Sequence, residues 1–145
     1  MIITKDILIE KEACEEGLDF VEKHNLYNLD SKDLALKLLE LKEFNYFFWF
    51  VNNFKIKDTK SMRDKITDSY SAYLYCRYIK DRKDMRDKIT DSFDAYHYCQ
   101  YVKDRKEIRD KITESEHAYW YYETISKKDK RLNELAKQFK KGVLW

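Results

Sequence analysis

The sequence contains no proline and only two glycines, Gly17 and Gly142, among its 145 residues. This scarcity excludes a Gly-rich phosphate-binding loop, which needs several glycines close together, and it predicts few tight turns. The three cysteines form no CxxC pair, and the chain has only three histidines. A disulfide framework and a Cys-rich zinc site are therefore not expected.

A long apolar segment is also missing. The longest apolar stretch, Phe44–Phe54, is interrupted by asparagines, whereas a membrane-spanning helix needs about 20 apolar residues. This stretch is predicted to be a core helix instead. Ile2 and Ile3 are followed at once by Lys5 and Asp6, which is unlike a secretory signal. We therefore expect a cytoplasmic protein with free, buried thiols and no membrane association.

Neither sign of charge dominates, because the net charge is +2 although 39% of the residues are charged. The two ends differ, however. Residues 1–43 hold six lysines and eleven acidic residues, and residues 126–145 hold seven basic and two acidic residues. We predict a single domain, 1–145, with an N-terminal helical module (1–43), a repeat array (44–125) and a basic capping helix and tail (126–145). Opposite charges at the two ends are compatible with a monomer or a weak homo-oligomer.

The repeat is the dominant pattern. Arg-Asp-Lys-Ile-Thr-Asp-Ser begins at Arg63 and at Arg86, and it returns at Arg109 with one Asp replaced by Glu, a period of 23 residues. A fixed period of this length is typical of stacked repeats that bury their apolar faces against neighbouring units. The sequence therefore predicts an all-α fold, a short helical-repeat solenoid of 23-residue units. Residues 44–62 are interpreted as a degenerate further copy.

Each unit is predicted to contain one main helix. Ala72, Cys76 and Ile79 are spaced i, i+4, i+7, so they form one helical stripe that we assign to the core. The helix is expected from about Asp68 to Lys80, with the preceding hydroxyl and carboxylate side chains capping its first turn. Cys14, in the N-terminal module, is assigned to a similar stripe.

A second, shorter helix is indicated in each unit by apolar pairs at i, i+4 spacing, such as Met85 with Ile89. One continuous helix per unit stays open as the alternative, since no Gly or Pro marks a break after Lys80. The Arg-Asp-Lys runs are interpreted as solvated charge, in which neighbouring units can form Arg–Asp ladders of small net value. A phosphate-binding role is less favoured, because every cation there has a carboxylate beside it.

One helix face varies between the copies. Positions 74, 97 and 120 are Leu, His and Trp, and on a helical wheel they lie with positions 71, 77 and 78 away from the core stripe. We predict that this face is solvent-exposed and determines specificity. The candidate partner-binding residues are Leu74, Tyr78, His97, Tyr101, Trp120, Arg77, Gln100 and Glu123.

The remaining candidate chemistry is weak. His97 lies two residues from Cys99, but the wheel places them on opposite sides of the helix, so they cannot converge on a metal. Cys76 and Cys99 belong to the core stripe, where a thiol is inert. We therefore predict no enzyme, no metal and no cofactor.

The segment Ala72-Tyr-Leu-Tyr-Cys-Arg-Tyr-Ile-Lys80 resembles the A-Y-x-Y-A-x-x-V-I-K repeats of a loose group of small phage and bacterial proteins. The opening segment from Ile7 to Leu18 is similar to the N-terminal module that many of them share. The group often has a Gly-Arg-Trp/Phe-Pro turn where this chain has Asp81-Arg-Lys. The resemblance implies an all-helical fold and a phage or mobile-element context, but no activity and no catalytic residues.

Two functions follow as hypotheses. The first is a non-enzymatic protein-binding module that grips a partner through exposed aromatic residues. With the resemblance, the partner would be an effector of a bacterial defence system in the host cytoplasm, as for an anti-CRISPR inhibitor. The alternative is a nucleic-acid-binding module that uses exposed aromatics and the basic C-terminal helix, with Lys137, Lys140 and Lys141 as phosphate contacts.

Overall fold

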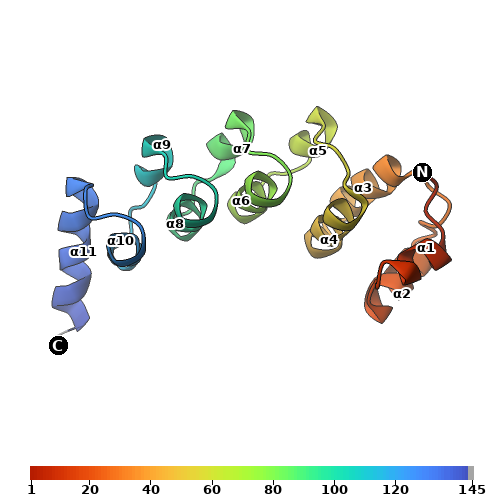
Figure 1. Ribbon diagram of the computed structural model, residues 1–145, viewed down its shortest axis with the longest axis horizontal. Helices are drawn as coiled ribbons and strands as arrows, with labels where there is room; N and C mark the ends of the chain where they lie inside the picture. Colours follow the sequence, from red (N-terminus) through yellow and green to blue (C-terminus); the bar gives the residue numbers. More distant parts are fainter. Residues whose placement is uncertain (144–145) are drawn as a thin grey trace. The chain divides into compact units, whose positions relative to one another are not determined.

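The computed structural model describes residues 1–143, and over that range the fold is all-helical, with eleven helices and no strand (Figure 1). The residues form two compact units, Met1–Ile66 and Thr67–Trp145. None of the helices within residues 1–143 is both long and apolar enough to cross a membrane.

The first unit contains five helices: α1 (Lys5–Glu10), α2 (Glu15–Lys23), α3 (Ser31–Glu40), α4 (Phe44–Phe54) and α5 (Lys60–Asp64). Side-chain caps begin three of them, as hydroxyl and carboxylate residues before a helix should. Thr4 accepts from the backbone N–H of Ile7, Asp30 from that of Lys32, and Thr59 from that of Met62.

The helices of the first unit end without glycine. Glu12, Asn25 and Lys42 lie just past α1, α2 and α3 with positive φ angles of 60°, 52° and 58°. After α3, the N–H of Lys42 bonds to the carbonyl of Leu39, and the N–H of Glu43 bonds to that of Leu38. This is the Schellman arrangement. Its residue with positive φ is usually glycine, because a residue with a Cβ is strained in the left-handed conformation. A chain with two glycines must fill these positions with other residues.

The core of the first unit lies between α3 and α4. Leu34, Leu38, Phe47 and Phe50 are all buried. The prediction that Phe44–Phe54 is a core helix is confirmed. Cys14, by contrast, is exposed at the start of α2. Its assignment to a buried stripe is wrong, because it is the N-cap residue and lies before the first helical turn.

The second unit contains six helices: α6 (Ser69–Tyr78), α7 (Lys83–Lys88), α8 (Ser92–Tyr101), α9 (Lys106–Arg109), α10 (Ser115–Thr124) and α11 (Lys130–Val143). The longer helices α6, α8 and α10 each begin at a serine of the sequence repeat. They pack in succession, α6 against α8 and α8 against α10, while the short α7 and α9 lie to one side of them (Figure 1). The interpretation with two helices per copy is confirmed, and one continuous helix is not found.

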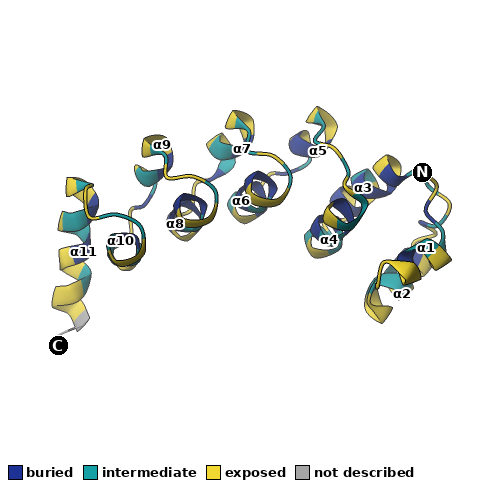
Figure 2. Ribbon diagram, viewed as in Figure 1, coloured by how far each residue is buried: buried dark blue, intermediate teal, exposed yellow. Residues whose placement is uncertain are grey.

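The core of the second unit contains alanines and tyrosines at equivalent positions of the three copies. The three alanines and three tyrosines are at most 1% exposed; they are Ala72, Ala95, Ala118, Tyr75, Tyr98 and Tyr121. Figure 2 shows α6 and α8 each with a buried side and an exposed side. The predicted stripe is correct at Ala72 and Cys76, but Ile79 is only half-buried. It lies past the last residue of α6, so it does not continue the helical stripe.

The C-terminal helix α11 is amphipathic and packs on α10. Leu132 and Ala136 are buried, and the ring of Phe139 lies 5.3 Å from that of Tyr119. Asp129 accepts a hydrogen bond from the N–H of Leu132 at 3.0 Å and so starts the helix. The amphipathic helix predicted for this segment is confirmed.

The cysteines should react with thiol reagents at very different rates. Burial raises the pKa of the Cys76 and Cys99 thiols to about 12 each, and only the thiolate is nucleophilic. We expect a thiol reagent at pH 8 to modify Cys14 quickly and the two buried cysteines only after unfolding. Mass spectrometry of native and denatured samples measures this. Rapid native labelling of Cys76 or Cys99 would contradict the packing of α6 and α8.

Candidate protein-binding site

Aromatic side chains gather on α6, α8 and α10 of the second unit. We call this set the aromatic face; it comprises Tyr70, Tyr78, Phe93, His97, Tyr101 and Trp120. Tyr70, Tyr78 and Tyr101 are each about half exposed, at 52%, 49% and 50%, and Phe93 is 40% exposed. Exposed rings are unusual in such number, because aromatic side chains normally gain stability by burial.

His97 lies at the centre of the aromatic face. Its ring centroid is 4.1 Å from that of Phe93, and it stacks on Tyr101 at 5.9 Å. Its Nδ1 lies 2.9 Å from the carbonyl oxygen of Phe93. A carbonyl oxygen can only accept, so Nδ1 carries the proton in the neutral ring. The imidazole is therefore held in one orientation between its neighbours.

Arg77 connects α6 to α8. Its guanidinium carbon lies 4.2 Å from the ring centroid of Tyr101 and 4.9 Å from that of Tyr78, and Nη1 donates to the hydroxyl of Tyr73 at 2.8 Å. Cation–π contacts of this kind restrict the motion of both rings in the free protein. Binding of a partner then costs less conformational entropy. The outer tyrosines are thus preorganised.

Trp120 is packed more tightly than expected. Its ring lies 5.1 Å from His117, 5.7 Å from Tyr96 and 6.3 Å from Phe93. Positions 74, 97 and 120 were all predicted to be exposed, and all three are half-buried. The prediction fails because a helical wheel describes one helix alone. Aromatic rings of the neighbouring helix cover part of this face. Gln100 and Glu123 are exposed, on α8 and α10.

Position 71 and its equivalent 94 are not on the exposed face, contrary to the prediction. Ser71 and Asp94 are 2% and 5% exposed. Burial raises the pKa of Asp94, and a hydrogen bond with the Ser69 hydroxyl partly offsets the effect. In the next copy, Nδ1 of His117 lies 2.9 Å from the hydroxyl of Ser92. Asp94 and His117 thus each contact the repeat serine of the preceding copy.

The repeat serines fasten successive copies together. The hydroxyl oxygen of Ser69 accepts from the N–H groups of Thr90 and Asp91 at 3.0 and 3.1 Å. Ser92 does the same for Thr113 and Glu114 at 3.0 and 3.1 Å. The backbone N–H groups of each loop thus find their hydrogen-bond acceptor in the long helix of the preceding copy. This accounts for the repeated serine without any functional role.

The Arg-Asp-Lys runs divide into two kinds of charge. The aspartates form exposed pairs with the lysine four residues earlier, such as Asp87 with Lys83 at 2.7 Å, as expected for solvated charge. The arginines do not, since Arg63 is 7% exposed and the side chain of Arg86 is 15% exposed. The interpretation of the arginines as solvated is therefore wrong, because each one folds back onto an aspartate five residues earlier.

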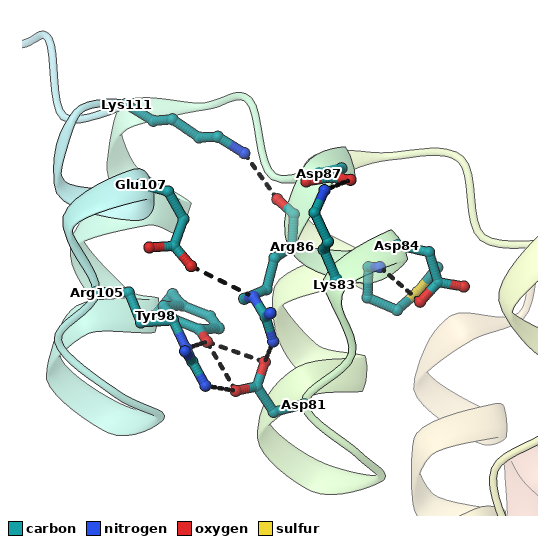
Figure 3. Close-up of polar contacts among 10 residues, drawn as sticks. Asp81, Lys83, Asp84, Arg86, Asp87, Tyr98, Arg105, Glu107 and Lys111 are labelled. Carbon is teal, nitrogen blue, oxygen red and sulfur yellow. Dashed lines mark hydrogen bonds and ion pairs between the residues drawn. The ribbon is translucent and has the colours of Figure 1, made fainter.

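The most connected polar cluster surrounds Asp81 (Figure 3). Its carboxylate accepts from Arg86 Nη1 at 2.9 Å, from the hydroxyl of Tyr98 at 2.9 Å and from Arg105 Nη2 at 3.1 Å. Burial alone would raise the pKa of Asp81, but these donors outweigh it and the pKa is lowered. Burial and the bond to Asp81 both raise the pKa of Tyr98. The cluster joins α7, α8 and the loop before α9, so we assign it a structural role.

Two aromatic-face residues, Tyr70 and Phe93, were not among the candidates from the sequence. A signal was present, because the equivalent position 116 is a glutamate, so this position varies as Tyr, Phe and Glu. Variation of this kind marked position 74 as well. Tyr70 and Phe93 were missed because they lie in the first turn, next to the capping residues.

The basic tail is placed differently from the aromatic face. Lys137 pairs with Glu134 at 2.8 Å, and the ammonium of Lys140 lies 5.5 Å from the ring of Tyr119. These residues border a groove of about 480 Å³ between α10 and α11. Lys141 is exposed on the same helix.

Within residues 1–143, no three His, Cys, Asp or Glu side chains are grouped so that they would hold a metal ion. Comparison of the chain with models of known protein families, with curated proteins and with solved structures finds no match in any of the three. The function proposed below therefore rests on the chain's own residues.

Proposed function

We propose that this chain is a non-enzymatic protein-binding module whose aromatic face is the contact surface. The observation that carries the proposal is the row of preorganised, half-exposed rings on three successive helices, with Tyr101 between His97 and Arg77. Tyrosine rings supply much contact area and lose little entropy on binding, and they are enriched among the residues that dominate binding energy.

The scaffold of this module is, in our proposal, a short helical-repeat solenoid with 23-residue units. Equivalent serines, buried tyrosines and Arg–Asp pairs recur at that spacing in the sequence and support it. Such a scaffold fixes the framework and leaves surface positions free to vary, as positions 70, 74 and 78 do.

We further propose a phage or mobile-element origin, with the partner an effector of a bacterial defence system such as CRISPR-Cas. The Tyr-rich segment from Ala72 to Lys80 supports this setting through its resemblance to small phage proteins. The module would then act in the cytoplasm of the bacterial host by occupying the effector's surface.

The aromatic face can be tested through Tyr101. Replacing Tyr101 by Ala should weaken partner binding by about 2 kcal/mol, or about 30-fold, if the ring is an anchor. Stability should change by only about 1 kcal/mol or less, because the ring is half-exposed. The measurement is capture of host proteins by the wild type, followed by the affinity of each variant for the captured protein.

Two controls make the test specific. Tyr101→Phe keeps the ring and should keep most of the affinity, and Leu41→Ala removes an exposed apolar side chain of the first unit and should leave it unchanged. Trp120 is less suitable, since its removal would also disturb packing with Phe93 and Tyr96. Equal binding by wild type and Tyr101→Ala would eliminate the aromatic face as the site.

The nucleic-acid alternative rests on α11, where Lys137, Lys140 and Lys141 lie within five residues of one another. Phosphate contacts would make affinity fall steeply between 50 and 200 mM salt, on the order of a thousandfold for six or more contacts. Binding through the aromatic face would respond little. Replacing the three lysines by glutamine separates the two functions, since it should abolish only the nucleic-acid mode.

A further inference from the structure

The repeat places an aspartate at equivalent positions three times, at Asp58, Asp81 and Asp104, and the cluster around Asp81 is complete. Arg105 approaches this cluster from the loop before α9. Its Nε donates to the hydroxyl oxygen of Tyr98 at 3.0 Å, and its Nη2 donates to Asp81 at 3.1 Å. One guanidinium group therefore bridges a phenol and a carboxylate (Figure 3). The aspartate side chain that receives it is 23% exposed.

The cluster around Asp104 has the same carboxylate and phenol but no such bridge. Asp104 accepts from Arg109 Nη1 at 3.0 Å and from the hydroxyl of Tyr121 at 2.8 Å. The position equivalent to Arg105 is Lys128, whose ammonium makes no hydrogen bond or ion pair with the other described side chains. The side chain of Asp104 is 33% exposed, more than that of Asp81.

The start of α11 also differs from the start of α9. By the repeat, a helix equivalent to α9 would begin at position 129, but α11 begins at Lys130 because Asp129 serves as its cap. Asp129 also forms an ion pair with Arg109, whose Nε lies 3.3 Å from its carboxylate. The loop that carries Lys128 is thus one residue longer than the loop that carries Arg105.

An opening of about 410 Å³ lies at the incomplete cluster. Its lining includes Asp104, Arg109, Tyr121, Ser126 and Lys128, which are the equivalents of Asp81, Arg86, Tyr98, Lys103 and Arg105. The volume is ample for a guanidinium group.

We propose that this opening is a binding site for an arginine side chain of a partner protein. The incoming guanidinium would donate to the Tyr121 hydroxyl oxygen and to Asp104, as Arg105 does to Tyr98 and Asp81 within the chain. The site is separate from the aromatic face and does not depend on it.

The chemistry selects guanidinium over ammonium. Guanidinium offers two adjacent, coplanar N–H donors at the spacing of the phenol and carboxylate oxygens, and an ammonium group is a hydrated point charge. Lys128 and Lys130 also line the opening, so a free cation is repelled in part. Both lysines are exposed, and screening in salt limits that repulsion. A single arginine should therefore bind weakly, on the order of millimolar.

The test uses the full chain and two small probes, N-acetyl-arginine methylamide and N-acetyl-lysine methylamide, in a ¹H–¹⁵N NMR titration. The arginine probe should give saturable shifts at the amides of Ser126, Lys128 and Asp129. Its affinity should be about tenfold higher than that of the lysine probe. Lys128→Arg supplies the missing guanidinium from within. It should abolish binding of the arginine probe and raise the melting temperature by about 3 °C.

A matched control is Asp110→Asn, which removes a neighbouring carboxylate that forms an exposed ion pair with Lys106 at 2.8 Å. It should leave probe binding unchanged. Equal affinity for the two probes, or no saturable shift with either, would overturn the proposal. So would a Lys128→Arg variant that still binds the arginine probe as the wild type does.

Discussion

Replacing Ala95 by Asp is expected to unfold the second unit. Ala95 is 0% exposed in α8, between α6 and α10, which both pack on that helix. A carboxylate there would be buried without a partner, at a cost of about 4 kcal/mol or more. Whole domains are stable by only about 5–15 kcal/mol. Far-UV circular dichroism against temperature measures the loss.

The control for this variant is Gln100→Asp, which introduces the same side chain on the exposed side of the same helix. It should cost only a few tenths of a kcal/mol, mainly because an acidic residue near a helix C-terminus is unfavourable, roughly 0.3–1 kcal/mol. If the two variants melted together, the orientation of α8 described here would be wrong.

Replacing Asp81 by Ala is expected to cost about 3 kcal/mol of stability. Two guanidinium groups, those of Arg86 and Arg105, would lose their shared carboxylate, and the buried hydroxyl of Tyr98 would lose its acceptor. Removing one member of a largely buried charge cluster typically costs about 3–5 kcal/mol, because the remaining charges stay uncompensated. Urea denaturation of both proteins measures the difference.

The same cluster gives a pH dependence of known sign. Since the folded-state pKa of Asp81 is lowered, its stabilisation is fully present above the unfolded value of about 3.9 and is lost as the pH falls through the lowered folded-state pKa. Asp81→Ala should therefore lose less stability than the wild type on acidification.

The control for Asp81→Ala is Asp87→Ala, which removes an ion pair with Lys83. Because the side chain of Asp87 is 59% exposed, this change should cost less than about 1 kcal/mol. Equal losses for Asp81→Ala and Asp87→Ala would show that the Asp81 cluster is solvated.

Much of the local structure could be read from the sequence because it depends on neighbouring residues. Thr4 and Asp30 cap helices where hydroxyl and carboxylate residues precede an apolar stripe. The alanine stripe of α6 and α8 is buried as its spacing predicts. The candidate site was harder to predict from the sequence. Tyr78 and Tyr101 are indeed exposed, but Trp120 is half-covered by rings from α8, which no single-helix pattern contains.

The sequence by itself determined the helices, their caps and the alternation of buried and variable positions, since each follows from side chains within about four residues of one another. Only the tertiary structure decided which polar residues are buried. Ser92 and Asp81 read as surface residues, yet they bond to groups 21 and 17 residues away. Their energy comes from excluding water where two copies meet, and that depends on the packing of helices rather than on local pattern.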